Sequence, residues 1–307
     1  MSSSSRRDPF TPHLLDGQRV LVTGGGSGLG LAIATALAGH GARVLLWGRR
    51  PAVLEEAASG IGAQAAFDVV DVRDPEAVDA AAERAFDDAP LTGLVNSAAA
   101  NFIAPTESLS PRAYRAVAST VMDGSFFTTH ALGKRWIAQA ASGSVVSLLT
   151  TWVDTGSAFV VPSAMAKAAV NAMTMSLAVE WARYGIRLNA VAPGPIPTDF
   201  AWEVLDPGAA AGAPDVIGAT DVRGIPAGRH GTPAEVANLV MFLLSDACDY
   251  LTGETVAMDG GQHLAGPSTF AGLTALTVDD WAAIRERGKA AAAATKARQQ
   301  QQQQQQQ

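Results

Sequence analysis

The chain has 307 residues, which is enough for one large domain or two small ones with a hydrophobic core that is stable without disulfide bonds. Apolar residues make up 48% and charged residues 17%, which excludes a mostly disordered, collagen-like or coiled-coil protein. The formal net charge of -7 argues against nucleic acid or an anionic membrane as a partner. The composition therefore predicts a compact globular protein and points to no polymeric partner.

Cysteine and histidine usage excludes further classes of site. Cys248 is the only cysteine, so a disulfide within the chain and a thiolate metal cluster are impossible. The 5 histidines lie far apart in sequence without ligand spacing, and we expect no metal site. No apolar run approaches the ~18 residues of a membrane span, and the first residues lack the core of a signal peptide. We therefore expect a cytoplasmic protein.

Short apolar runs alternate with helical patterns along the chain. The segment 29–38 has apolar residues at helical spacing, and alanine-rich helical stretches separate the later runs. We expect strands at 19–22, 43–47, 65–69, 91–96, 144–149, 186–191 and 253–258. Strands that alternate with helices form right-handed βαβ units and a sheet covered on both faces. The predicted fold class is α/β, a single doubly wound Rossmann domain with a central, mostly parallel seven-stranded sheet flanked by helices.

The bounds of the central domain follow from the family resemblance described below, and those of the other segments from composition. Residues 1–16 form an N-terminal arm and 17–264 the Rossmann domain. A stretch near 200–226, rich in Gly, Ala and Pro, has no sustained period and is predicted to be a lid over the substrate. Residues 265–298 form a C-terminal extension with a helix at 281–297. The polyglutamine tail 299–307 cannot bury apolar surface and is expected to be disordered.

A glycine-rich segment lies between the first strand and the first helix. Its glycines allow a tight turn and close approach to a pyrophosphate, while the amides at the helix start bind anionic oxygens. The strand-turn-helix context favours a phosphate site over a glycine turn without a ligand. The residues expected to hold the phosphates are Gly24, Gly26, Ser27, Gly28, Leu29 and Gly30.

The second predicted strand is followed by Arg49 and Arg50 instead of an acidic residue. Enzymes that prefer NAD usually place an acid there to accept from the ribose hydroxyls. Paired guanidiniums match a 2′-phosphate, so the sequence predicts NADP (NADPH) as cofactor.

The glycine segment has the T-G-x-x-x-G-x-G spacing that resembles the short-chain dehydrogenase/reductase family. Further landmarks follow in the family's order over about 17–264. They are an adenine-contacting acid, an N-x-A segment after the fourth strand, a helix-borne lysine and a Pro-Gly pair after the sixth strand. The resemblance implies a homotetramer and cofactor contacts at Asp71, Val72, Asn96, Ser97, Ala98, Lys167, Pro193, Gly194, Ile196 and Thr198.

Within that family, the segments 101–107, 156–167, 192–196 and 277–284 look most like mitochondrial-type 2,4-dienoyl-CoA reductases. Asn101, Ser163 and Lys167 match catalytic positions of this subgroup, and Trp152 stands where the subgroup has a tyrosine. The resemblance implies an NADPH-dependent reductase of acyl-CoA thioesters or other conjugated carbonyl compounds.

The chain departs from the wider family at its acid positions. The family's tyrosine, four residues before its lysine, is replaced by Ser163, and its serine by Thr150. The position of its asparagine falls on Val121. Ordinary carbonyl reduction has thus lost its usual acid. Reduction of a dienoyl thioester instead needs donors aimed at the thioester oxygen, which Asn101, Ser163 and the indole N–H of Trp152 could supply.

Each candidate also has a purely structural interpretation. Ser163 and Lys167 could share a solvated helix face, Trp152 could be a packing residue, and Asn101 could bond its own backbone. Thr150 could simply end a strand. The alternative functions are a ketone or 3-oxoacyl thioester reductase that uses Thr150 and water, and a cofactor-binding protein without turnover.

Overall fold

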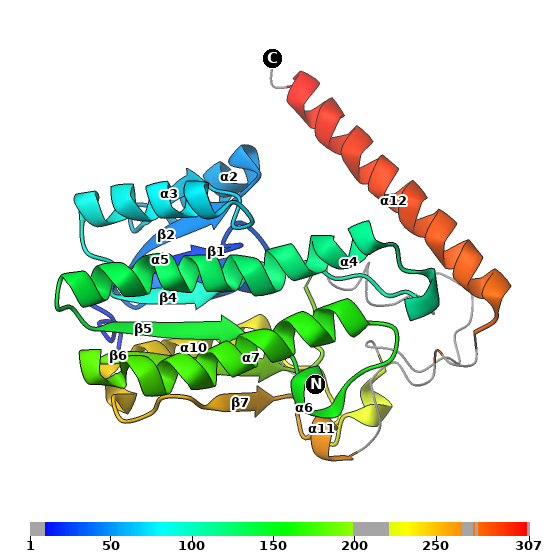
Figure 1. Cartoon of the computed structure of the whole chain (residues 1–307). Coiled ribbons are helices and arrows are strands. Elements are labelled where there is room, and N and C mark those ends of the chain that lie inside the picture. The colour runs from blue at the N-terminus through cyan, green and yellow to red at the C-terminus, as the bar shows by residue number, and fades with distance from the viewer. Residues whose placement is uncertain (1–9, 199–220, 266–272, 274–275, 306–307) are drawn as a thin grey trace, which may run out of the picture.

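The protein contains one parallel sheet of seven strands, which runs through the middle of the body in Figure 1. The computed structural model describes residues 10–198, 221–265, 273 and 276–305. The strands follow the order β3-β2-β1-β4-β5-β6-β7, and every neighbouring pair is parallel. They are β1 (Arg19–Thr23), β2 (Arg43–Gly48), β3 (Ala65–Val69), β4 (Gly93–Asn96), β5 (Gly143–Leu148), β6 (Ile186–Pro193) and β7 (Thr255–Met258). The predicted α/β fold class is confirmed.

The sheet is covered by helices on both faces. One layer holds α3 (Pro75–Asp88), α5 (Gly124–Ala138) and α7 (Val161–Trp181), and the other holds α1 (Gly28–Gly39), α2 (Pro51–Ile61) and α10 (Pro233–Leu244). Smaller helices are α4 (Pro111–Ala118), α6 (Trp152–Thr155) and α11 (Gln262–Ala265), and α12 (Val278–Gln305) extends from the body. In the described part of the chain, no helix is long and apolar enough to cross a membrane.

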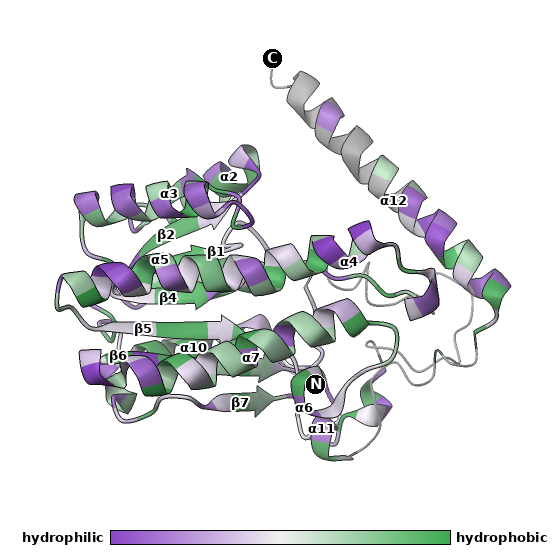
Figure 2. Cartoon of the chain, viewed as in Figure 1, coloured by the Kyte–Doolittle hydropathy of each residue, from purple (hydrophilic) through white to green (hydrophobic). Residues whose placement is uncertain are grey.

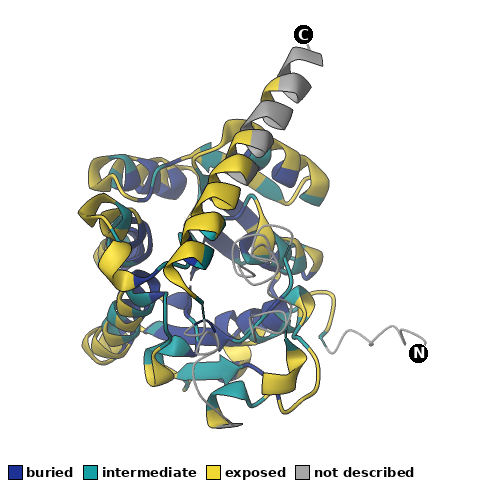
Figure 3. Cartoon of the chain, turned by 90° about the vertical axis from the view of Figure 1, so that its right-hand side faces the viewer, coloured by how far each residue is buried: buried dark blue, intermediate teal, exposed yellow. Residues whose placement is uncertain are grey.

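The alternation of side chains along each strand builds the two halves of the core. Val20 and Val22 of β1 pack in the layer with α1 and α10, whereas Leu21 packs on the opposite face with α3 and α5. The central strands are mostly hydrophobic in Figure 2 and buried in Figure 3, whereas the edge strands β3 and β7 are partly exposed. The outer face of α3 is largely hydrophilic in Figure 2. Burial on both faces explains why the strands read as continuous apolar runs.

The strand order reverses between β1 and β4, which lead to β2 and β5 on opposite sides. Loops leaving these two strands turn to opposite faces and open a crevice at their carboxyl ends. The topology therefore places the expected ligand site at the ends of β1 and β4.

The termini differ in part from the sequence-based expectations. Leu15 is fully buried, so this part of the predicted N-terminal arm packs onto the domain. Most of the predicted lid lies outside the described residues, which resume with a short helix at Val222–Gly224. The C-terminal helix begins at Val278 and continues through the glutamines to Gln305, where disorder was expected. Glutamine is a good helix former, and extending a helix is easier than nucleating one.

Candidate active site

A cavity of about 780 Å³ opens at the carboxyl ends of the strands. It is lined by the glycine turn before α1, the ends of β2 to β6 and the first turns of α7. It brings together all but one of the predicted site residues. They are Gly24, Gly26, Ser27, Gly28, Leu29, Gly30, Arg49, Arg50, Asp71, Val72, Ser97, Ala98, Asn101, Thr150, Trp152, Ser163, Lys167, Pro193, Gly194, Ile196 and Thr198.

The glycine turn depends on conformations that only glycine adopts easily. Gly24 and Gly28 have φ of +67° and +56°, in the left-handed region. A Cβ on Gly30 would collide with the carbonyl oxygen of Gly24, so α1 can start tightly against the turn. Thr23 Oγ1 accepts hydrogen bonds from the amides of Ser97 and Ala98, both at 3.1 Å, and so ties the turn to the end of β4.

Asn96 is the one predicted residue that does not line the cavity. Its side chain is buried, and Nδ2 donates to Thr129 Oγ1 at 2.9 Å and to Ser147 Oγ at 3.3 Å. These bonds connect β4 to α5 and β5 beneath the cavity. The side chain therefore supports the backbone of the next two residues, Ser97 and Ala98, which do line it.

Cationic groups gather beside the end of β2. Arg50 donates to Ser27 Oγ at 3.4 Å, which brings this guanidinium to the start of α1. Asp71 is engaged by Arg73, whose side-chain hydrogen bonds are the main cause that lowers the pKa of Asp71. The charge of Arg49 lowers that pKa further. Asp71 is thus held ionised, and Arg49 and Arg50 supply positive charge to this end of the cavity.

Lys167 and Ser163 lie one turn apart on α7, and both side chains are buried. The Lys167 ammonium donates to the carbonyl oxygen of Leu148 at the end of β5. Burial lowers the pKa of Lys167 from 10.5 to about 8, because removal from water disfavours the charged form. These residues therefore do not form the solvated helix face that the sequence left open.

Asn101 lies in the loop after β4. Its Oδ1 accepts a hydrogen bond from the amide of Phe102 at 2.9 Å. This is the local backbone bond that the sequence allowed, and it fixes the orientation of the side chain. Because the oxygen is used, the NH₂ group is the end that can donate to a ligand.

Trp152 and Thr150 follow β5 and line the same end of the cavity. The carbonyl of Thr150 accepts from the amide of Val153 at 3.2 Å, and Trp152 begins α6. Thr150 therefore both terminates the strand region and faces the cavity.

Some features of the site are absent from the sequence-based prediction. A π-helical turn, Ser119–Asp123, separates α4 from α5 and brings Thr120 to the cavity wall. Val121, at the family's asparagine position, is buried against Val117. Trp47 and Gln262 also line the cavity. Apolar periodicity does not indicate a π turn. The only signal for Thr120 as a site residue is that it precedes Val121, at the family's asparagine position.

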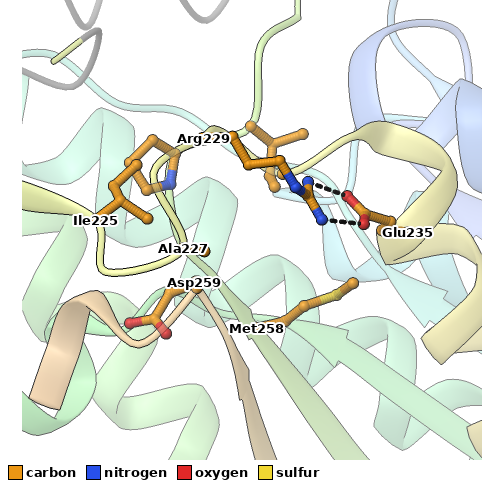
Figure 4. A pocket seen from close by; sticks show the side chains of 10 residues that line it. Ile225, Ala227, Arg229, Glu235, Met258 and Asp259 are labelled. Atoms are coloured by element: carbon orange, nitrogen blue, oxygen red, sulfur yellow. Dashed lines mark hydrogen bonds and ion pairs between the residues drawn. The ribbon is translucent and has the colours of Figure 1, made fainter. Parts of the chain in front are cut away.

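A second cavity of about 90 Å³ lies beside the first and shares Pro195 and Ile196 with it. In Figure 4 the guanidinium of Arg229 faces the carboxylate of Glu235, and they are joined by hydrogen bonds of 2.7 and 3.0 Å. Asp259 accepts from the amides of Gly261 and His263 at 3.0 and 2.7 Å. Asp259 lies against the turn after β6, where a Cβ on Gly194 would lie 2.6 Å from Asp259 Cβ.

Comparison with known proteins agrees with this geometry. The family model described as enoyl-(acyl carrier protein) reductase matches residues 24–263. A Caenorhabditis elegans protein named "Probable 2,4-dienoyl-CoA reductase" is 43% identical over 254 residues, which are 80% of this chain and 81% of that one. A Bacillus subtilis protein named "Probable 2,4-dienoyl-CoA reductase" is 41% identical, covering 81% and 98% of the two chains. Its name specifies it as (2E)-enoyl-CoA-producing, whereas the C. elegans protein is named as (3E)-enoyl-CoA-producing. A gluconate 5-dehydrogenase from Burkholderia cenocepacia, solved with NADP and tartrate, is 30% identical with a TM-score of 0.74, covering 83% and 99%.

A Rossmann domain with a glycine turn and a buried helix-borne lysine in one cavity defines an oxidoreductase of the nicotinamide-dependent kind. The chain belongs to the short-chain dehydrogenase/reductase family.

Proposed function

We propose that the protein is an NADPH-dependent reductase that transfers hydride to a conjugated acyl thioester, as a 2,4-dienoyl-CoA reductase does. The observation that carries this proposal is the set of polar groups at the substrate end of the cavity. Among the described residues, Asn101, Trp152 and Ser163 line that end and no tyrosine or histidine does. Such a site can donate hydrogen bonds but has no side-chain phenol or imidazole to deliver a proton.

The residues at the other end fit the dinucleotide cofactor. The turn closed by Gly24 and Gly30 has no room for a Cβ, and its amides with Ser27 would hold the pyrophosphate. Arg49 and Arg50 would pair with a 2′-phosphate. The adenine would lie against Asp71 and Val72, the ribose against Lys167, and the nicotinamide between Ser97-Ala98 and the segment from Pro193 to Thr198. When bound, NADPH supplies the hydride.

The substrate end would stabilise the charge that develops during reduction. Hydride addition to the far carbon of a dienoyl thioester moves negative charge onto the thioester oxygen. The NH₂ of Asn101, the indole N–H of Trp152 and the hydroxyl of Ser163 would donate to that oxygen. Neither an amide nor an indole gives up a proton at neutral pH, so we assign the proton to solvent.

The test compares NADPH oxidation with a 2,4-dienoyl-CoA, a 3-oxoacyl-CoA and a simple ketone. We expect turnover with the dienoyl thioester alone. Turnover with the oxo compounds would favour a carbonyl reductase that uses Thr150 and water. Tight NADPH binding without turnover on any of the three would favour a cofactor-binding protein.

Substitution at Trp152 tests the donor role directly. Trp152→Phe keeps an aromatic body but removes the N–H, and losing one oxyanion donor costs about a hundred- to a thousandfold in turnover. Trp152→Tyr restores a donor and should retain activity. A loss below about threefold in the phenylalanine variant, which is less than ~0.7 kcal/mol, would show that Trp152 only packs.

We also propose that the protein is a homotetramer. The outer faces of α5 and α7, which lie side by side in Figure 1, expose apolar side chains. Phe126 and Met175 are about half exposed, and Val179 is 83% exposed. Exposed apolar side chains on neighbouring helices are typical of a surface covered by another subunit.

A further inference from the structure

An apolar cluster lies behind the substrate end of the cavity and joins segments that are remote in sequence. We call it the C-terminal cluster. It includes Trp281 and Ile284 of α12, which lie beyond the 24–263 range matched by the family model. Its members are Ile103, Trp152, Phe159, Val160, Leu273, Leu276, Trp281 and Ile284.

The start of α12 fixes the direction of Trp281. Thr277 and Asp280 bond each other reciprocally, with the Thr277 amide donating to Asp280 Oδ2 at 2.8 Å and the Asp280 amide to Thr277 Oγ1 at 3.3 Å. This cap sets the first turn, so that Val278 is 81% exposed while Trp281 is only 6% exposed. Trp281 is therefore held toward the body of the domain.

Trp281 packs on a residue with an unusual backbone. Its ring lies against that of Phe159, with centroids 4.8 Å apart and planes tilted by 45°. Phe159 has φ of +65°, a conformation that a bulky residue adopts only when its surroundings hold it there. The Trp281 ring is one of the groups that provide this support.

Phe159 also connects the two segments that carry the proposed oxyanion donors. Its carbonyl accepts a hydrogen bond from the amide of Ala104 at 3.0 Å. Ala104 belongs to the loop of Asn101, and Phe159 belongs to the segment between Trp152 and Ser163. Trp281 does not line the cavity. Within the part of the chain that the structure describes, Trp281 therefore reaches the cavity through Phe159 and its neighbours in the cluster.

We infer that Trp281 is a positioning residue, which holds Trp152 and Asn101 in place through Phe159. Its catalytic consequence rests on the proposed function. Without the indole, Phe159 loses one of its supports, the bond to Ala104 opens more often, and both donors lose their alignment. The cofactor end is held by β1, α1 and Thr23, none of which belongs to the cluster, so cofactor binding stays intact.

The first experiment compares Trp281→Ala with Trp281→Phe and with Val278→Ala, a control on the exposed side of the same turn. We expect the alanine variant at 281 to lose about ten- to a hundredfold in turnover with an unchanged Kd for NADPH. Phenylalanine should restore most of the rate, and Val278→Ala should match wild type. Because Trp281 acts in part through Trp152, the loss should be smaller when Trp152 is already phenylalanine, with the part that passes through Asn101 remaining. Full additivity, or a parallel loss of NADPH binding, would overturn the inference.

The second experiment needs neither substrate nor turnover. Amide hydrogen exchange at Ala104 should quicken by at least about tenfold in Trp281→Ala and stay unchanged in Val278→Ala. The amide of Gly24, which donates to the Trp47 carbonyl at 2.8 Å, should stay protected in both. Unchanged exchange at Ala104 would overturn the inference. If Ala104 exchange rises in a protein that reduces no dienoyl thioester, the proposed function fails while the role of Trp281 stands.

Discussion

Lys167 is expected to destabilise the empty protein while it supports cofactor binding. The side chain is 8% exposed, and burial lowers its pKa from 10.5 to about 8. One pKa unit corresponds to about 1.4 kcal/mol, so keeping the ammonium charged at pH 7 costs the fold about 3 kcal/mol. In Lys167→Met that cost disappears, but the carbonyl of Leu148 loses its donor, which costs about 1 to 3 kcal/mol. We expect the methionine variant without cofactor to be as stable as wild type or up to about 2 kcal/mol more stable.

The pH dependence separates this explanation from a change in packing. The unfolded chain keeps the Lys167 proton up to about pH 10.5, whereas the folded chain releases it above about pH 8. Between those values the unfolded state binds more protons, so wild-type stability rises with pH relative to the variant. The penalty is complete below pH 8 and absent above pH 10.5. Urea unfolding of both proteins should show that the stability gained by Lys167→Met at pH 7 is smaller at pH 10.

Whereas Lys167→Met should not lower the stability of the empty protein, it should weaken cofactor binding. In Lys167→Met we expect weaker NADPH binding and slower hydride transfer together, because a misplaced nicotinamide loses its reactive geometry. Lys289→Met removes an exposed lysine of α12 and should change neither stability nor binding. An unchanged NADPH affinity and rate in Lys167→Met would show that this lysine does not contact the cofactor. A stability difference that is independent of pH would refute the desolvation argument.

Three further predictions concern the cofactor end and the outer helices. Replacing Arg49 and Arg50 by alanine should weaken NADPH binding about ten- to a hundredfold and leave NADH binding unchanged. If the wild-type protein binds NADH as tightly as NADPH in a low-salt titration, the two arginines do not bind the 2′-phosphate. Gly30→Ala should disrupt the phosphate turn and lower NADPH affinity at least about tenfold. The matched change Gly39→Ala, where nothing lies within 4 Å of an added Cβ, should leave cofactor titrations at the wild-type value. Val179→Glu should dissociate the proposed tetramer, as measured by light scattering. A mass equal to that of wild type would show that Val179 does not lie in a subunit contact.

The sheet could be predicted because its signals are local. A strand buried on both faces reads as a short apolar run, and the right-handed crossover then limits the topology to a few arrangements. Ala65–Val69 matches its predicted bounds. Leu91 was expected to begin the fourth strand, but that strand begins at Gly93. Leu91 is buried in the preceding loop, where its carbonyl accepts from Trp136 Nε1. Apolar character indicates burial and does not by itself distinguish a strand from a packed loop.

Part of the cavity could be predicted from the sequence, namely where a local motif needs particular residue types for a physical reason. The glycine turn is such a case, since a left-handed backbone at Gly24 strongly favours that residue type. The side chain of Asn96 was not predictable in the same way, because its partners Thr129 and Ser147 come from other elements. The contact of Trp281 with Phe159 was not predictable either, because it joins two segments that are remote in sequence. Contacts between segments remote in sequence become visible only once the fold brings them together.

The distribution of charge along the cavity explains how a family fold can work without the family's tyrosine. Permanent positive charge from Arg49 and Arg50 lies at one end, where an anionic cofactor would bind. Neutral donors from Asn101 and Trp152 line the other end. A neutral donor in a partly closed site stabilises a developing oxyanion without changing its own protonation state. This set of donors therefore suits a reaction that creates an enolate-like oxygen better than one that must protonate an alkoxide at once. In the proposed function, Ser163 in place of tyrosine thus favours reduction of a conjugated thioester, while the glycine turn and arginines of the cofactor end are kept.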